Sequence, residues 1–130
     1  MGLFDFFNNR DKYESDYNSD LPKNGACVCL AIAQYSHCSP STIAKDMQGR
    51  YGSSFNQLNN VVDYLQRNNF VRNVKYNPNM TIDDFLCSDL TDDKYLIVVP
   101  GHILYWSKQL FDFSINFKYS DKIICLLRMN

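Results

Sequence analysis

The 130-residue sequence contains no apolar run near the roughly 20 residues that a membrane-spanning helix needs. It also lacks an excess of charge of one sign, because 13 Lys and Arg residues stand against 14 Asp and Glu residues, a net charge of −1. Broad electrostatic binding to nucleic acid or an anionic membrane needs a clear basic excess or a continuous basic stripe. The composition therefore predicts no membrane span and no nucleic-acid partner.

The five cysteines are odd in number and lack the spacing of a disulfide framework. The start of the chain has no basic segment followed by an apolar one, so no secretory signal is expected. Both features favour a reducing compartment, and we expect a cytoplasmic protein.

The first 20 residues differ from the remainder in composition. They contain two basic and five acidic residues, and the stretch 8–20 is polar without apolar periodicity. We therefore expect an irregular or mobile acidic arm over 1–20 and a single domain over 21–130. The exception is a Phe-rich segment, which either packs onto the domain or docks on a partner or a second copy. Its apolar residues are Leu3, Phe4, Phe6 and Phe7.

Hydrophobic periodicity and capping residues predict helices first and an antiparallel sheet afterwards, which is an α+β arrangement. A buried helix is expected within Asn24–Tyr35, and a second from Ser39-Pro40 to about Gln48. The spacing of Phe55 to Leu65 is typical of an amphipathic helix. A short strand, a Thr81-capped helix and a four-strand meander should follow. The expected strands are Phe70–Tyr76, then Tyr95–Val99, His102–Trp106, Leu110–Phe113 and Lys122–Met129.

Cys27 is the expected nucleophile. It follows the Asn24-Gly25 turn and falls in the first turn of the predicted helix, near backbone N–H groups and the positive end of the helix dipole. Both favour the thiolate, which is the reactive form of cysteine. Cys29 is the rival, but about 200° separates the two positions around a helix, so both cannot face one histidine.

A cysteine nucleophile requires a base that is distant in sequence but close in space. His102 follows Pro100-Gly101 at the start of an apolar strand, and Asp112 lies in the next strand-like run. His102 would transfer the proton and Asp112 would orient its ring. Asp121 and Asn116 are weaker alternatives for the third position.

The order Cys, His, Asp is that of a papain-like enzyme, and the local motifs agree. Cys27 with Ala31-Ile32-Ala33 resembles the nucleophile helix of small papain-like cysteine proteins of phages and bacteria. Gly101-His102 resembles their histidine strand, and Leu110-Phe111-Asp112 the strand of their third catalytic residue. Gly52–Leu58 is similar to a middle segment in the peptidase domain of bacteriocin-processing ABC exporters.

The resemblance implies a papain-like domain and a thiol-dependent hydrolase that cleaves a peptide, isopeptide or amide bond without a cofactor. Papain has a glutamine six residues before the cysteine to complete its oxyanion hole. This chain has Leu21 there, and Asn24 is the expected substitute. The substrate would be a peptide or protein, and a phage-encoded protein would act in the host cytoplasm. The alternative is a non-catalytic interaction protein with the same fold.

One further arrangement of ligand types is present in the sequence. Cys27, Cys29, His37 and Cys38 could together suggest a metal site. Zinc knuckles normally place wider cysteine pairs in a turn, whereas Cys27 and Cys29 fall within a predicted helix. We therefore expect no metal site.

Overall fold

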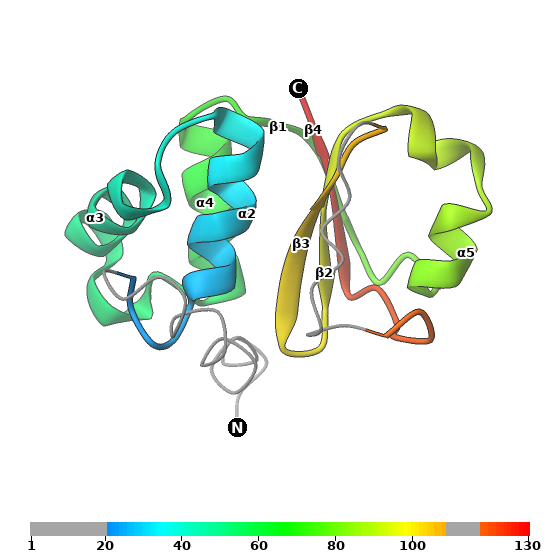
Figure 1. Ribbon diagram of the computed structural model, residues 1–130, viewed down its shortest axis with the longest axis horizontal. Helices are drawn as coiled ribbons and strands as arrows, with labels where there is room; N and C mark the ends of the chain where they lie inside the picture. The colour runs from blue at the N-terminus through cyan, green and yellow to red at the C-terminus, as the bar shows by residue number, and fades with distance from the viewer. Residues whose placement is uncertain (1–20, 109–117) are drawn as a thin grey trace.

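The computed structural model of the protein describes residues 21–108 and 118–130. The predicted arm over 1–20 and the predicted strand with Asp112 lie outside these residues. The described part is an α+β structure, and Figure 1 shows its sheet between two groups of helices. The helices are α2 (Ala26–Ser36), α3 (Pro40–Tyr51), η2 (Gly52–Ser54), α4 (Leu58–Arg67), α5 (Ile82–Leu86) and η3 (Asp89–Asp92). The strands are β1 (Val71–Tyr76), β2 (Tyr95–Val99), β3 (His102–Trp106) and β4 (Cys125–Met129).

The helices begin at residues that cap them. Ser39 accepts a hydrogen bond from the Thr42 N–H and places Pro40 in the first turn of α3. Thr81 and Asp84 form a capping box at α5, in which each side chain accepts from the other residue's backbone N–H. Both caps confirm the predicted helix starts. Helix α3 continues three residues beyond the predicted end at Gln48 and stops before Gly52.

Helix α4 shows the amphipathic pattern that the sequence predicts, with its apolar residues buried on one side. It begins at Leu58 instead of Phe55, because Phe55 belongs to the preceding turn and packs there with 3% of its surface exposed. Helix α2 is buried over most of its surface, as expected for a helix that is apolar on all sides. It lies between β3 and α3.

The described strands form an antiparallel sheet in the order β1-β4-β2-β3. A meander would place the last strand after β3, so the predicted meander is wrong at this position. Strand β4 instead pairs with both β1 and β2. The physical reason is burial: four of the five β4 residues are buried, including neighbours that point to opposite faces, so this strand is stabilised by a central position. Strand β1, which is largely exposed, lies at one end of the order.

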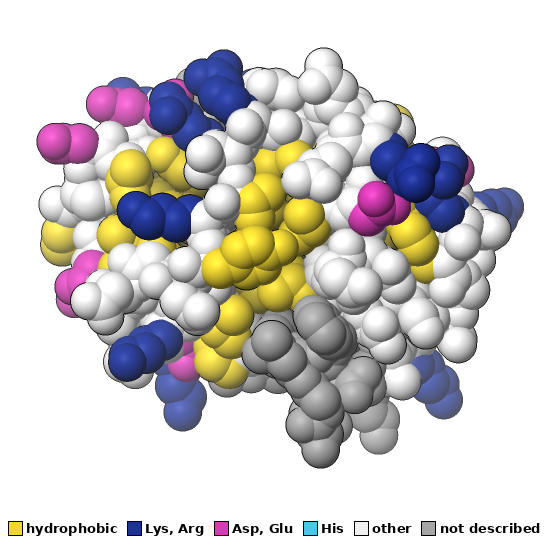
Figure 2. Space-filling view, turned by 180° about the vertical axis from the view of Figure 1, so that it is seen from behind, with side chains coloured by type: hydrophobic (Ala, Val, Ile, Leu, Met, Phe, Trp, Pro, Cys, Tyr) yellow, Lys and Arg dark blue, Asp and Glu magenta, His cyan; other side chains and the backbone are white. Residues whose placement is uncertain are grey.

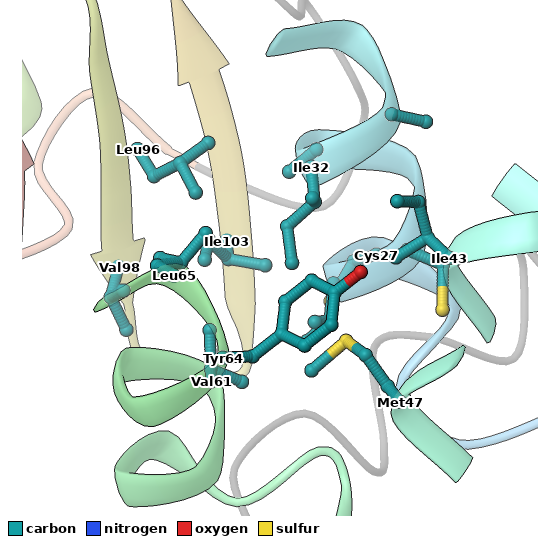
Figure 3. Close-up of a cluster of buried hydrophobic side chains, with 14 of the residues drawn as sticks. Cys27, Ile32, Ile43, Met47, Val61, Tyr64, Leu65, Leu96, Val98 and Ile103 are labelled. Atoms are coloured by element: carbon teal, nitrogen blue, oxygen red, sulfur yellow. The ribbon is translucent and has the colours of Figure 1, made fainter. Parts of the chain in front are cut away.

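The two faces of the sheet carry separate hydrophobic clusters, because successive strand residues point to opposite sides. Helices α2 and α4 lie over one face, where Leu96, Val98 and Ile103 pack, and α3 packs against α2 (Figures 1 and 3). Helix α5 covers part of the other, where Ile97 and Leu104 pack. Among the described residues, none of these helices is long and apolar enough to cross a membrane.

Candidate functional site

The start of α2 is fixed by Gly25. This residue is the N-cap and has a φ of 91°, in the left-handed region that glycine adopts without strain. A Cβ atom at this position would lie 2.6 Å from Phe55 Cζ and 2.7 Å from Asn56 Cβ. The turn before α4 therefore packs directly on the glycine, and the first turn of α2 is held against it. Asn56 is a buried polar residue at this contact, and the sequence pattern alone did not identify it.

Cys27 lies in this first turn, as predicted. The backbone hydrogen bonds of the helix begin with the N–H groups of Val28 and Cys29, which donate to Gly25 O. The Cys27 N–H therefore lies at the helix N-terminus, where the dipole is positive and attracts negative charge. Asn24 is exposed and Leu21 is buried. The two expected oxyanion donors are therefore close in the sequence, because Asn24 lies three residues before Cys27.

The Cys27 side chain is 1% exposed and belongs to the apolar cluster between the helices and the sheet (Figure 3). Cys29 is 0% exposed and belongs to the same cluster, so exposure does not distinguish the two thiols. Burial, then the hydrogen bond to Asp46, raises the pKa of Tyr64, with a smaller contribution from Cys29. Apolar burial disfavours a charged thiolate and acts against the helix dipole.

His102 is the first residue of β3 and is 0% exposed. It follows the Pro100-Gly101 turn and pairs with Val99 across the hairpin. Figure 1 shows this turn and the first turn of α2 at the same end of the molecule. Strand alternation, however, assigns His102 to the face of Val99 and Leu104, opposite the face on which Ile103 meets α2. A contact between Cys27 and His102 must therefore pass around the end of the sheet, and it stays a prediction.

The third residue of the expected triad, Asp112, lies outside the described residues, as does Asn116. The other alternative, Asp121, has a structural position. Its carboxylate accepts a hydrogen bond from the Lys118 N–H at 2.8 Å, and its carbonyl oxygen accepts from the Ile82 N–H at 3.1 Å. It thereby connects the 118–121 turn to the start of α5.

The four residues considered as metal ligands are distributed over different environments. Cys27 and Cys29 are buried in the core, whereas Cys38 is exposed. His37 ends α2 with a φ of 62° and donates its backbone N–H to Ala33 O. Within residues 21–108 and 118–130, no three His, Cys, Asp or Glu side chains come together as a metal site.

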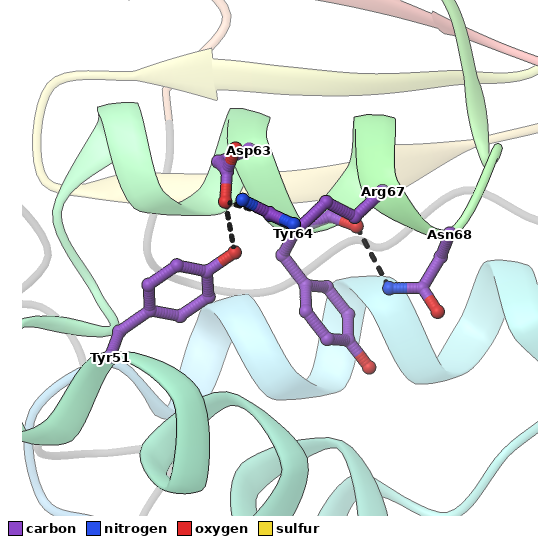
Figure 4. Close-up of polar contacts among 5 residues, drawn as sticks. All are labelled: Tyr51, Asp63, Tyr64, Arg67 and Asn68. Carbon is purple, nitrogen blue, oxygen red and sulfur yellow. Dashed lines mark hydrogen bonds and ion pairs between the residues drawn. The ribbon is translucent and has the colours of Figure 1, made fainter.

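A polar network between α3 and α4 was not predicted from the sequence. Tyr51 donates a hydrogen bond of 2.6 Å to Asp63, and Arg67 donates to the same carboxylate oxygen at 2.8 Å (Figure 4). The Tyr51 hydrogen bond, then that of Arg67, lowers the pKa of Asp63. Burial and the bond to Asp63 raise the pKa of Tyr51 to about 12. The Asp63–Arg67 spacing of four residues is typical of an ion pair on a helix and could have been predicted from the sequence. No sequence pattern indicated that Tyr51 would bind the same carboxylate.

Cys125 is the other buried thiol that sequence reasoning missed. It lies on β4, opposite Val98, in the cluster beneath the helices. Burial raises its pKa from 9.0 to about 12, so it is a protonated, inert core residue at neutral pH. Burial is the cause of this shift, so Cys125 shows what apolar surroundings do to a thiol in this protein.

Comparisons of the chain with protein-family models, with curated proteins and with solved structures gave no match.

Proposed function

We propose that the protein is a thiol-dependent hydrolase of the papain-like type that acts on a peptide, isopeptide or amide bond. The observation that carries the proposal is the position of Cys27 in the first turn of α2, at the end of the molecule where β3 begins with His102 (Figure 1). A nucleophile and a base from distant segments must meet in space, and in this proposal Cys27 and His102 meet around the end of the sheet. The resemblance of the Cys27 helix and the Gly101-His102 strand to papain-like proteins supports the same function.

In this proposal the Cys27 thiolate attacks the carbonyl carbon of the substrate and forms a tetrahedral intermediate. The Cys27 N–H, with the Asn24 side chain as the second donor, stabilises the oxyanion. His102 has accepted the thiol proton and returns it to the leaving amine. Asp112 orients the imidazole ring. Water then attacks the acyl-enzyme, and the thiol is released.

A second candidate function is a non-catalytic interaction domain. The observation that favours it is the burial of both Cys27 and His102, which are 1% and 0% exposed. A nucleophile must reach a substrate carbonyl, whereas a core cysteine need not be accessible. Under this alternative, the small side chains of α2 serve only its close packing.

Thiol alkylation distinguishes the two functions. The chain is treated with iodoacetamide over a range of pH, and each labelled cysteine is identified by mass spectrometry. Cys38 and Cys87 are exposed and provide internal reference rates for ordinary thiols. An activated Cys27 is alkylated faster than these references below the usual thiol pKa of about 8.5.

Two variants give the controls. Cys29→Ala, a change in the same helix and cluster, should leave the Cys27 rate unchanged. His102→Gln keeps a polar side chain of similar size but removes the base, and it should reduce the Cys27 rate at neutral pH to that of an ordinary thiol or below. If Cys27 reacts only as the protein unfolds, and His102→Gln changes nothing, the non-catalytic function replaces the hydrolase.

A further inference from the structure

A hollow of about 360 Å³ lies on the α5 face of the sheet, away from α2 and Cys27. It exists because α5 has only five residues and packs over β2 and β3, where Phe85 meets Tyr95 and Trp106 at 5.2 and 5.8 Å. Within the described residues, the face of β1 beside it is exposed at Asn73 and Lys75. The hollow is lined by Arg72, Asn73, Lys75, Pro78, Met80, Leu90, Tyr95, Leu126 and Arg128.

The strand register explains how these side chains converge. Lys75 pairs with Leu126, and Asn73 pairs with Arg128, so all four lie on one face of the β1–β4 pair. Arg128 also pairs with Tyr95 on β2. Three adjacent strands therefore form the floor, and the β1–α5 connection with Met80 and the η3 residue Leu90 form the wall.

The charge of the hollow is positive. Arg72, Lys75 and Arg128 line it, and the described carboxylate that balances them is Asp93, whose Oδ2 lies 2.6 Å from Arg128 Nη2. The Nε atom of Arg128 is buried and, within the described residues, donates to no acceptor. Buried donors are normally satisfied, so an acceptor from outside the chain would lower the free energy of this group.

The apolar part of the hollow complements this charge. Met80 and Leu90 are half-buried, and Leu126 is 5% exposed. Figure 2 shows hydrophobic side chains gathered on the rear side of the molecule, with Lys and Arg side chains next to them. A volume near 360 Å³ lies within the range of small-molecule sites, which are mostly apolar with a few placed polar groups.

We propose that this hollow binds a small organic anion with an apolar body. The carboxylate or phosphate oxygens of the ligand accept hydrogen bonds from Arg128 and Lys75, and its apolar body contacts Met80, Leu90 and Leu126. Arginine and lysine together favour an anionic headgroup, and the apolar wall excludes a purely inorganic ion as the best ligand. The site lies on the face opposite α2, so it is independent of any thiol chemistry there.

The test uses octanoate as the anionic probe, with 1-octanol and octylammonium as neutral and cationic probes of equal chain length. Binding to the full chain is followed by ¹H–¹⁵N correlation spectra at millimolar probe. We expect octanoate to shift the amide signals of Lys75, Leu126 and Arg128, and to bind at least about fivefold more tightly than 1-octanol. A fivefold difference corresponds to about 1 kcal/mol, which exposed ion pairs of this kind can supply.

Matched variants test which cations of the protein attract the anionic probe. Arg72→Gln with Lys75→Gln removes two exposed cations from the hollow and should weaken octanoate binding about fivefold to tenfold. Lys45→Gln with Arg50→Gln removes two exposed cations on α3, on the other side of the molecule, and should leave the affinity unchanged. Arg128→Lys keeps the charge but removes the buried Nε, and it should also weaken binding.

Three outcomes overturn the proposal. The first is the absence of shifts at the β1 and β4 amides with millimolar octanoate. The second is equal binding of octanoate and octylammonium. The third is an equal loss of affinity in the α3 double variant and in the Arg72→Gln, Lys75→Gln variant, because the attraction would then come from net charge and not from this site.

Discussion

Replacing Gly25 with alanine tests whether the start of α2 is held as the structure describes. Two costs add at this position. The φ of 91° is one that alanine adopts with a penalty of about 1–2 kcal/mol. The new Cβ would also lie 2.6 Å from Phe55 Cζ and 2.7 Å from Asn56 Cβ, and inserting an atom into a packed contact costs about 1–3 kcal/mol. We expect Gly25→Ala to lower the free energy of unfolding by about 2–5 kcal/mol.

Two other glycines separate these costs. Gly52 has a φ of 65° and a ψ of −145°, a conformation outside the left-handed helical region that glycine alone adopts readily, but a Cβ added there would meet no atom within 4 Å, so Gly52→Ala should cost only a conformational part, about 1–3 kcal/mol. Gly49 lies inside α3 with open space around it, and Gly49→Ala should stabilise the protein by about 0.5–1 kcal/mol. The free energies are measured by urea denaturation followed by circular dichroism.

The size of the Gly25→Ala effect is the decisive result. If Gly25→Ala costs no more than the conformational part of about 1–2 kcal/mol, the close approach of Phe55 and Asn56 to the first turn of α2 is wrong. The site built on that turn would then lose its structural basis. If Gly49→Ala also destabilises the protein, replacement of glycine is unfavourable in this protein even where space is open. The cost of Gly25→Ala would then be no evidence for the contact with Phe55 and Asn56.

Other predictions concern polar groups at helix ends and between helices. Thr81→Ala should lower the free energy of unfolding by about 1 kcal/mol through loss of the capping box, whereas Thr81→Ser should retain most of it; equal effects would contradict the capping role. Burial and the bond to Asp63 raise the pKa of Tyr51 from 10.0 to about 12 in the folded protein, so its contribution to the free energy of unfolding is present below pH 10 and is lost as the pH rises through 12. Between these two pH values the free energy of unfolding should fall more steeply in the wild type than in Tyr51→Phe. The same variant should raise the pKa of Asp63, measured by carboxyl NMR titration, and an unchanged value would contradict the bond. Cys29→Ala should cost about 1 kcal/mol or somewhat more in a melting experiment, because the thiol is fully buried.

Local features of the fold were predictable because their causes are local. Ser39-Pro40 and Thr81 act on the backbone within four residues, and the burial of α4 follows from a repeat of 3.6 residues. The Pro100-Gly101 hairpin likewise joins strands whose bounds match the predicted ones. Each of these signals can be read without knowing what lies across the molecule.

The features that failed depend on distant partners. The place of β4 between β1 and β2 is set by pairing with a strand about 50 residues earlier in the sequence. The local pattern of 122–129 does not indicate which strands it pairs with. The contact of Gly25 with Phe55 and the hollow beside α5 arise in the same way, from elements that approach only after folding. The burial of Cys27, which is as complete as that of Cys29, likewise depends on elements that pack around α2 only after folding.

The burial of Cys27 makes His102 the decisive residue for the proposed chemistry. A helix N-terminus stabilises a negative charge by about 0.3–1 kcal/mol, and by about 2 kcal/mol in favourable buried geometry. Burial raises the pKa of Cys125 from 9.0 to about 12, which corresponds to a penalty of about 4 kcal/mol for its thiolate. The dipole of a helix is therefore too weak by itself to offset a burial penalty of this size. A nearby imidazolium is the further contribution that could reverse this balance, and His102 is the histidine at that end of the molecule. If His102→Gln leaves the alkylation rate of Cys27 unchanged across neutral pH, His102 does not activate the thiol, and the proposed hydrolysis by this pair of residues is wrong.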